Sequence, residues 1–297
     1  MRVLISNDDG VYAPGLLALY QALSTIAEVV VVAPMTEQSG CASALSISTP
    51  LYTQQLDSGF IAVNGSPADC VYLALHELYP QTRFDCVITG INSGANLGQD
   101  VLFSGTFGAA LTAQIFGIPA IATSLVGGGV KGKTQEQVSQ YQVAANEIVK
   151  LLTETPTLNI CKNLPYHVLN VNIPDVESAD DIKGRKITSL AHRQIARPVH
   201  AVIDPRGREA YWLSLRKRPY ELSADIEKES LSVQNLLHQK TLPQQTASQA
   251  AEETGAQSSA IKLTDDQAVA AGYISLSPVR LHHTPTNTLD ELSALFL

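Results

Sequence analysis

Two adjacent carboxylates, Asp8 and Asp9, follow a short apolar run near the start of the chain, in the segment Ser6–Gly10. Two neighbouring carboxylates repel each other unless a positive charge lies between them. At the carboxyl end of a buried strand, a hard cation supplies that charge most simply. The alternative is an ordinary polar loop in which one aspartate caps the next helix, and this segment alone does not decide between the two.

Two later loops carry oxygen donors that could complete a metal site. Ser39 lies in the loop after the second predicted strand, and Asn92 lies in the glycine-rich loop after the strand predicted at 84–89. The loops at the carboxyl ends of parallel strands emerge at one edge of the sheet, where ligands bind. Ser39 and Asn92 can therefore converge on the two aspartates, and an all-oxygen donor set suits Mg²⁺, Mn²⁺ or Ca²⁺ better than zinc.

A possible phosphate seat follows at Ser104 and Thr106, which stand just before or at the start of a predicted helix at 106–116. A helix N-terminus offers unpaired N–H groups and a partial positive charge, and the two hydroxyls add donors. The same pattern also occurs as a simple helix N-cap. Capping and phosphate binding are compatible, so both interpretations stay open.

These residues depend on an alternation of strands and helices through the first half of the chain. Continuous apolar runs predict buried strands at 2–6, 29–33, 84–89, 119–125 and 166–173. Helical spacing of apolar residues, with Pro14 at a first helical position, predicts helices at 14–23, 68–78, 106–116 and 134–152. The pattern is typical of an α/β fold with a mostly parallel sheet flanked by helices.

The alternation of strand and helix patterns ends at about residue 183, so we expect a core domain at 1–183 and a smaller C-terminal region at 184–297. Strands are predicted at 185–191 and 201–215, the second bent at 205–207 to give an antiparallel hairpin. Residues 236–259 are rich in Gln, Ala, Ser and Thr and predict a flexible insertion. Thr264 should cap a short helix, followed by a strand at 273–276 and a terminal helix from 288.

Composition narrows the classes of protein that fit. The 297 residues carry a net charge of −8, and 45 % are hydrophobic. An acidic chain of this kind is a poor candidate for binding a nucleic-acid polymer. A strand predicted to begin at Arg2 leaves no room for a signal peptide, and no apolar run reaches the ~18 residues that span a bilayer. The four scattered cysteines fit a reducing compartment, so we expect a cytoplasmic protein with no membrane partner.

Four motifs in this order resemble the survival protein SurE family. They are 5–10 with 13–15, then 63–70, 90–98 and 104–106, and the resemblance runs from residue 1 to about 174 and resumes near 264–278. It implies a Rossmann-like core, one divalent metal per subunit and a C-terminal part that assembles a homodimer or homotetramer. It further implies a 5′-nucleotidase, with acid phosphatase or 3′-nucleotidase activity also described. The family's metal ligands map onto Asp8, Asp9, Ser39 and Asn92.

The same resemblance maps the phosphate side of the site onto Asn96, Ser104, Gly105 and Thr106. We expect Mg²⁺ or Mn²⁺ as the cofactor, a nucleoside monophosphate as the substrate, and Asp8 and Asp9 as the catalytic residues. One route is attack by a metal-bound water that an aspartate positions. The other is direct attack by a carboxylate to give an aspartyl-phosphate. The sequence leaves both routes open.

A competing motif spans Gly127–Thr134, which satisfies the Walker A pattern of a P-loop NTPase. Such an enzyme also needs an aspartate at the end of a later apolar strand. The remaining candidate strand, at 168–173, is interrupted by Asn170 and Asn172 and then ends at Pro174. A glycine-rich loop without nucleotide chemistry is the simpler interpretation. A non-catalytic nucleotide-binding module remains a further alternative.

Overall fold

The computed structural model describes residues 1–128, 135–176, 178–192, 195–196, 199–213, 218–219 and 263–280. The chain divides into two units, one formed by 1–191 with 262–297 and the other by 192–261. The first unit contains every residue predicted to form the site.

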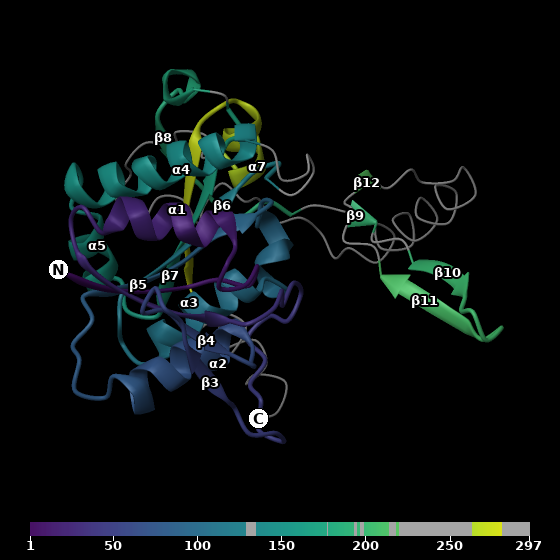
Figure 1. Cartoon of the computed structure of the whole chain (residues 1–297). Helices are drawn as coiled ribbons and strands as arrows, with labels where there is room; N and C mark the ends of the chain where they lie inside the picture. The colour runs from purple at the N-terminus through teal and green to yellow at the C-terminus, as the bar shows by residue number, and fades with distance from the viewer. Residues whose placement is uncertain are drawn as a thin grey trace, which may run out of the picture. The chain divides into compact units, whose positions relative to one another are not determined.

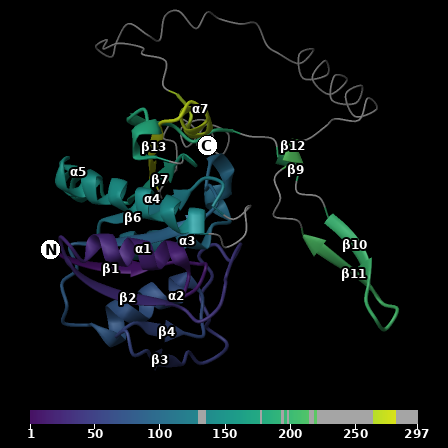
Figure 2. The same ribbon diagram turned by 45° about the horizontal axis from the view of Figure 1, so that its top comes forward.

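A nine-stranded sheet forms the centre of the first unit, in the order β3-β4-β2-β1-β5-β6-β7-β13-β8. Figure 2 shows β3, β4, β2 and β1 side by side in that order. The pairs from β4 to β7 are parallel, whereas β3 and β13 run antiparallel to β4 and β7. The strand bounds are β1 Arg2–Ser6, β2 Glu28–Pro34, β3 Thr53–Gln55, β4 Ile61–Val63, β5 Cys86–Ser93, β6 Ala120–Leu125, β7 His167–Ile173, β8 Arg185–Ile187 and β13 Ile274–Arg280.

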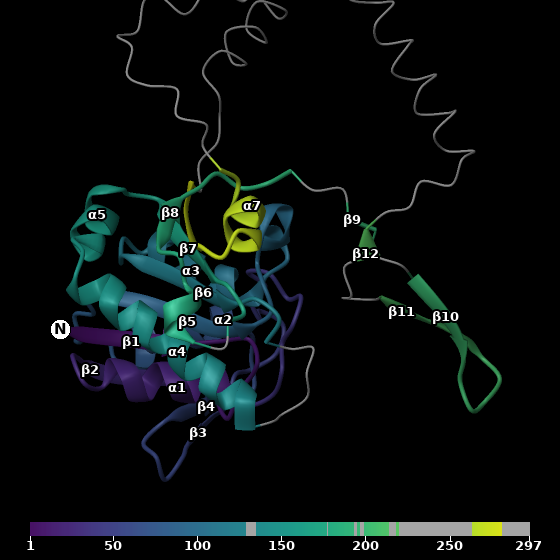
Figure 3. The same ribbon diagram turned by 90° about the horizontal axis from the view of Figure 1, so that it is seen from above.

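Helices cover both faces of this sheet. Helices α1 (Pro14–Leu23) and α4 (Gln135–Thr153) lie side by side on one face, as Figures 1 and 3 show. Helices α2 (Pro67–Leu73) and α3 (Gly105–Ile115) pack together on the other face, and a π turn at Ala74–Leu78 extends α2. The predicted α/β class, with a mostly parallel sheet between helices, is confirmed.

Each buried strand contributes side chains to two separate hydrophobic cores, because successive side chains point to opposite faces of a sheet. In β1, Val3 and Ile5 join the core under α1 and α4, whereas Leu4 joins the core under α2 and α3. Burial on both faces explains why this strand reads as a continuous apolar run rather than as an alternating one. The carboxyl ends of β1, β2 and β5 then deliver the three loops of the predicted site to one edge.

The boundary of the first unit differs from the expected one at residue 183. Strand β8 and strand β13 both belong to the nine-stranded sheet, where they pair in parallel, so the unit continues past residue 183 to Ala191. The predicted strand 185–191 is shorter than expected and is not part of the hairpin. Helix α7 (Asp265–Ala270) begins after Thr264, as predicted, and the Thr264 N–H donates to Gln267 Oε1 at 3.2 Å.

The second unit contains an antiparallel hairpin of β10 (Val199–Ile203) and β11 (Glu209–Leu213). The Asp204 carboxylate accepts hydrogen bonds from the backbone N–H groups of Arg206 and Arg208, at 2.8 and 2.9 Å, and so closes the turn. A short pair of strands, β9 (Ile195–Ala196) and β12 (Arg218–Pro219), belongs to the same unit. The predicted hairpin with a turn at 205–207 is confirmed.

Several elements complete the description. Short helices occur at α5 Thr157–Asn163, η2 Gly98–Leu102 and η3 Ala179–Asp181. The predicted insertion at 236–259 and the predicted helix from 288 lie outside the described residues. Among the helices of the described part, none is long and apolar enough to cross a membrane.

Candidate active site

The loop after β1 places Asp8 in the interior of the first unit, with only 4 % of its surface exposed. The Asn7 side-chain amide donates to the Gly10 carbonyl at 2.9 Å, and Gly10 has a φ of 103°, which glycine adopts readily. The backbone N–H of Gln38 donates to the Asp8 carbonyl at 2.7 Å, and that of Val11 donates to the Pro34 carbonyl at 2.8 Å. The first loop is therefore tied to the loop after β2.

The N-terminus of α3 meets Asp8 directly. The Thr106 hydroxyl donates a hydrogen bond to Asp8 Oδ1. A Cβ atom added to Gly105 would lie 2.9 Å from the Asp8 Cβ and 2.8 Å from the Cys41 Sγ, so a side chain at this position would not fit. Glycine at 105 lets the first turn of the helix approach the carboxylate, so the structure brings this turn and Asp8 together.

Burial raises the pKa of both aspartates. For Asp8, burial outweighs the opposing effect of the Thr106 hydroxyl and of the backbone N–H groups of Asp8 and Thr106. For Asp9, burial and then the charge of Asp8 raise the pKa to about 7, although the Ser93 N–H donates to Asp9 Oδ2 at 3.0 Å. Glu37 adds to the negative charge near both residues. The site accumulates negative charge that a cation would neutralise.

Strand β5 extends into the glycine-rich motif and thereby brings Asn92 and Ser93 to the site. The pairing of β5 with β6 shifts register between Thr89 and Asn92. A Cβ atom on Gly90, whose φ is 121°, would lie 2.3 Å from the Thr123 carbonyl oxygen. Only glycine therefore fits at this position between β5 and β6. The Asn92 side-chain amide donates to the Gly94 carbonyl at 2.8 Å, which orients the side chain within its own loop.

Ser39 differs from the other predicted metal ligands because it is exposed. Its hydroxyl donates to Glu37 Oε1 at 2.8 Å, and among the described residues no hydrogen bond joins Ser39 to Asp8 or Asp9. The bond between Gln38 and Asp8 nevertheless holds this loop beside the aspartates. The Ser39 oxygen keeps its lone pairs while its proton is donated to Glu37, so this bond does not prevent it from ligating a cation.

Asn96 lies in a buried network of hydrogen bonds. Its side-chain amide donates to Ser124 Oγ at 3.0 Å, and its N–H donates to Asn172 Oδ1 at 2.9 Å. The amides of Asn170 and Asn172 both donate to the Asn96 carbonyl, at 2.9 and 3.0 Å. The two asparagines that interrupt the apolar pattern of β7 thus fix the loop that carries Asn96.

Ser104 serves as the N-cap of α3, since its hydroxyl accepts from the Phe107 N–H at 3.0 Å. It is buried, like Thr106. Capping is therefore present at this helix terminus.

Tyr141 on α4 was not identified from the sequence as a site residue. The phenol is buried and is hydrogen-bonded to the Ser93 side chain. Burial raises its pKa and outweighs the opposing effect of the bond to Ser93, and the charge of Asp9 adds to the rise. At helical spacing Tyr141 is indistinguishable from an apolar core residue, so only the contact with Ser93 reveals its position. Ser93 itself lay within the quoted motif, but its backbone bond to Asp9 depends on the register shift in β5.

The donor set fits a hard divalent cation. Two carboxylates of raised pKa face the same loops, and the Asn7 Oδ1 atom is buried there without a hydrogen-bond partner. In the described residues no three or more His, Cys, Asp or Glu side chains are grouped as a metal site. The remaining ligands would have to be amide and hydroxyl oxygens and water, as Mg²⁺ and Mn²⁺ accept.

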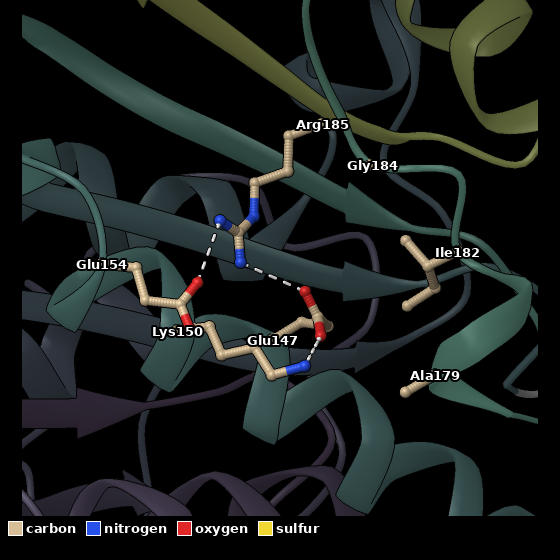
Figure 4. A pocket seen from close by; sticks show the side chains of 7 residues that line it. All are labelled: Glu147, Lys150, Glu154, Ala179, Ile182, Gly184 and Arg185. Atoms are coloured by element: carbon tan, nitrogen blue, oxygen red, sulfur yellow. Dashed lines mark hydrogen bonds and ion pairs between the residues drawn. The ribbon is translucent and has the colours of Figure 1, made fainter.

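A separate cavity is lined by Glu147 and Lys150 of α4, by residues near η3 and by Arg185 of β8 (Figure 4). Lys150 pairs with Glu147 at 2.7 Å, and Arg185 pairs with Glu147 at 3.2 Å and with Glu154 at 3.8 Å. The two cations and the carboxylates therefore neutralise one another. None of the predicted site residues lines this cavity, and it does not compete with the aspartate site.

Fold and site together define a class of protein. The chain is an α/β protein with an aspartate pair at the carboxyl edge of a parallel sheet, and the buried member of the pair, Asp8, meets a helix N-terminus. This arrangement suits a protein that binds a metal and a phosphate group side by side.

Comparison with known proteins identifies the family. The model of the family described as "Survival protein SurE" matches residues 3–197. A protein of Psychrobacter cryohalolentis, named 5′-nucleotidase SurE, is 71 % identical over 297 residues, which is 100 % of both chains. A protein of the same name from Acinetobacter baylyi is 39 % identical and covers 98 % of both chains. The chain therefore belongs to the survival protein SurE family, as the motifs predicted.

A solved structure supports the same assignment. The crystal structure of the Sure protein from Aquifex aeolicus superposes with a TM-score of 0.69 at 31 % sequence identity and covers 100 % of both chains. The fold implied by the sequence motifs is thereby confirmed by an independent comparison of coordinates.

Proposed function

We propose that this chain is a metal-dependent 5′-nucleotidase, a phosphomonoesterase that converts nucleoside monophosphates to nucleosides and phosphate. The observation that carries the proposal is the contact between Asp8 and Thr106, which joins the carboxylate pair to the N-terminus of α3. Full-length relatives named 5′-nucleotidase SurE support it. Neither the family model nor these relatives favour a P-loop NTPase, and residues 129–134 of that motif lie outside the described structure.

Asp8, Asp9, Ser39 and Asn92 are the residues that would hold Mg²⁺ or Mn²⁺. A bound divalent cation would supply Lewis-acid polarisation of the phosphate and a water of lowered pKa. Asp8 is fixed by Thr106, and Asp9 is fixed by the Ser93 N–H. Each carboxylate is thus held in one orientation before the cation or the substrate arrives, which lowers the cost of assembling the site.

The N-terminus of α3 would bind the phosphoryl oxygens through Ser104, Gly105 and Thr106. The Gly105 N–H and the Ser104 hydroxyl can stabilise the charge that builds up on those oxygens, whereas the Thr106 hydroxyl donates to Asp8 and so couples this terminus to the metal side. Asn96 would contribute mainly by holding its loop, because its amide already donates to Ser124. A carboxylate pair can position an attacking water or attack phosphorus itself, and the geometry supports both routes.

Two further features belong to the proposal. We place the protein in the cytoplasm on the sequence expectation alone. We also propose a homodimer or homotetramer assembled through the second unit, because every residue of β10 and β11 is exposed and Tyr211, Trp212 and Leu213 form a continuous apolar run on β11.

The decisive experiment measures phosphate release from 5′-AMP, 3′-AMP and ATP, with Mn²⁺ or Mg²⁺ and with EDTA. We expect metal-dependent release from 5′-AMP that EDTA abolishes, and loss of most of that activity in Asp8→Asn. Release from ATP alone, with both monophosphates untouched, would contradict the proposal and favour the motif at Gly127–Thr134. Normal turnover by Asp8→Asn at saturating metal would remove Asp8 from the mechanism.

A further inference from the structure

Asp265, the first residue of α7, is a fully buried carboxylate outside the site described above, with 0 % of its surface exposed. It accepts three backbone hydrogen bonds. Oδ2 accepts from the Gly98 N–H at 2.8 Å, and Oδ1 accepts from the N–H groups of Ala191 and Asp266, both at 2.9 Å. Burying a carboxylate is costly unless charge-assisted hydrogen bonds compensate, so these three N–H groups stabilise the buried Asp265 carboxylate. In turn, the carboxylate fixes the positions of the three backbone segments that donate to it.

Gly98 and Ala191 touch at the same point. Gly98 has a φ of 56°, and a Cβ atom added to it would lie 2.4 Å from the Ala191 carbonyl oxygen. The chain leaves the first unit after Ala191. Three segments distant in sequence therefore meet at one carboxylate, and the position of Gly98 is set by residues from the end of the fold.

Gly98 lies between Asn96, which holds this loop through Ser124, and the helix terminus proposed to bind phosphate. Asn96 stands two positions before it, and Gly98 begins the 3₁₀ turn that leads to Ser104 and the first turn of α3. We call residues 96–106 the phosphate segment. Other described contacts also hold this segment. Asn96 bonds to β7 and to Ser124, and the Phe103 carbonyl accepts from the Ala42 N–H at 3.2 Å. Thr106 accepts from the Thr89 hydroxyl at its carbonyl, at 2.7 Å, and donates its own hydroxyl to Asp8.

The residues proposed to bind the metal are anchored elsewhere. Asp8 is held by Gln38 and Thr106, Asp9 is held by the Ser93 N–H, and Asn92 is held within its own loop. Of these contacts, only the one to Thr106 involves the phosphate segment. Releasing Gly98 should therefore disturb phosphate binding far more than metal binding.

We infer that Asp265 is a positioning residue for the phosphate segment, acting through the backbone of Gly98. This inference rests on the proposed function, because it assigns the substrate phosphate to residues 96–106. Asp265 touches neither substrate nor metal. Its effect is to keep the segment in the conformation that presents Ser104, Gly105 and Thr106 to the phosphoryl oxygens.

The test is Asp265→Asn in the full-length protein, because asparagine keeps the shape but replaces one acceptor oxygen with a donor. We expect the KM for 5′-AMP and the inhibition constant of inorganic phosphate to rise together, each roughly tenfold, as for loss of one charge-assisted hydrogen bond. The dissociation constant of Mn²⁺, measured by calorimetry, should change by less than about twofold. A merely structural role would lower the active fraction, and hence the maximal rate, and leave KM unchanged.

Two variants complete the design. Gly98→Ala disturbs the same junction through steric contact with Ala191, and it decides the question if Asp265→Asn does not fold. Asp85→Asn is the matched control, because Asp85 Oδ2 also accepts a backbone N–H, from Arg2 at 2.8 Å, at the amino end of β1. We expect no change in KM for Asp85→Asn.

Phosphate affinity measured by calorimetry with Mn²⁺ present separates this inference from the proposed function. A wild-type protein without nucleotidase activity would contradict the function, yet the phosphate affinities would still test the role of Asp265. Equal phosphate affinities in wild type, Asp265→Asn and Gly98→Ala would overturn the inference. A parallel loss of Mn²⁺ affinity would overturn it as well, because the effect would then not be confined to the phosphate segment.

Discussion

The hydroxyl of Thr106 donates a hydrogen bond to the buried carboxylate of Asp8, so the first turn of α3 and the loop after β1 form one polar unit. A hydroxyl that donates to a carboxylate favours its ionised form and opposes the rise in pKa that burial causes. The same helix terminus is proposed to receive the substrate phosphate. Thr106 therefore connects the metal side of the site to its phosphate side.

Thr106→Val should lower kcat/KM for 5′-AMP by roughly tenfold to a hundredfold, because a hydrogen bond to a charged group is lost. Without the hydroxyl the pKa of Asp8 rises further, so the acidic limb of the pH–rate profile should move to higher pH. Thr112→Val is the matched control, because its buried hydroxyl donates to the Gly108 carbonyl in the same helix, at 2.9 Å. An unchanged acidic limb in Thr106→Val, or an equal shift in Thr112→Val, would contradict this role.

The raised pKa of Asp9 predicts how the metal-free protein responds to pH. In the unfolded chain the pKa is about 4, whereas in the folded protein it is about 7. The folded state therefore binds more protons between these values, and its stability should fall as the pH rises through this window. Asp9→Asn removes the penalty, so this variant should be more stable than wild type at pH 8, by on the order of a few kcal/mol, and the difference should vanish near pH 4.

Urea unfolding at several pH values, with EDTA present, measures this difference. Asp180→Asn controls for the loss of one negative charge, because Asp180 is an exposed residue of the same unit. Saturating Mn²⁺ should reverse the order, since wild type gains binding energy that Asp9→Asn lacks. Equal stabilities of wild type and Asp9→Asn at pH 8 without metal would contradict the raised pKa.

Much of this site could be predicted from the sequence because its parts are local. Asp8 and Asp9 follow an apolar strand, and Ser104 and Thr106 lie at the start of a helix, so strand and helix patterns alone place them at one edge of the sheet. The hairpin turn was equally visible, because proline and glycine mark it within a polar segment. The sequence motifs also identified the family, which the comparisons confirm.

The contacts that depend on tertiary packing could not be predicted in this way. Asp265 appears in the sequence only as an acidic residue in the first turn of a short helix, and nothing local indicates that it binds Gly98. Asn170 and Asn172 look like defects in an apolar strand until their bonds to Asn96 are seen. The short strands β3 and β4 were missed because three-residue segments carry too little periodicity to detect.

Tyr141→Phe tests a contact that only the structure reveals. The phenol hydroxyl is bonded to the Ser93 side chain, and the Ser93 N–H holds Asp9. We expect kcat for 5′-AMP to fall by about threefold to tenfold, because a neutral hydrogen bond contributes about 1 kcal/mol. The control is Tyr20→Phe, since Tyr20 packs edge-on against Phe60. Equal activities of the two variants would show that Tyr141 contributes packing alone.

Trp212→Glu tests the proposed assembly through the second unit. Trp212 is 70 % exposed and shares one face of the hairpin with exposed Val202, whereas Tyr211 and Leu213 are exposed on the other face. Exposed apolar side chains on both faces favour burial against another copy of the chain. Light scattering after gel filtration should give a multimeric mass for wild type and a smaller mass for Trp212→Glu. Tyr52→Glu is the control, because Tyr52 is an aromatic residue of similar exposure, at 65 %, in the first unit. A monomeric wild type, or an unchanged mass in Trp212→Glu, would contradict assembly through this hairpin.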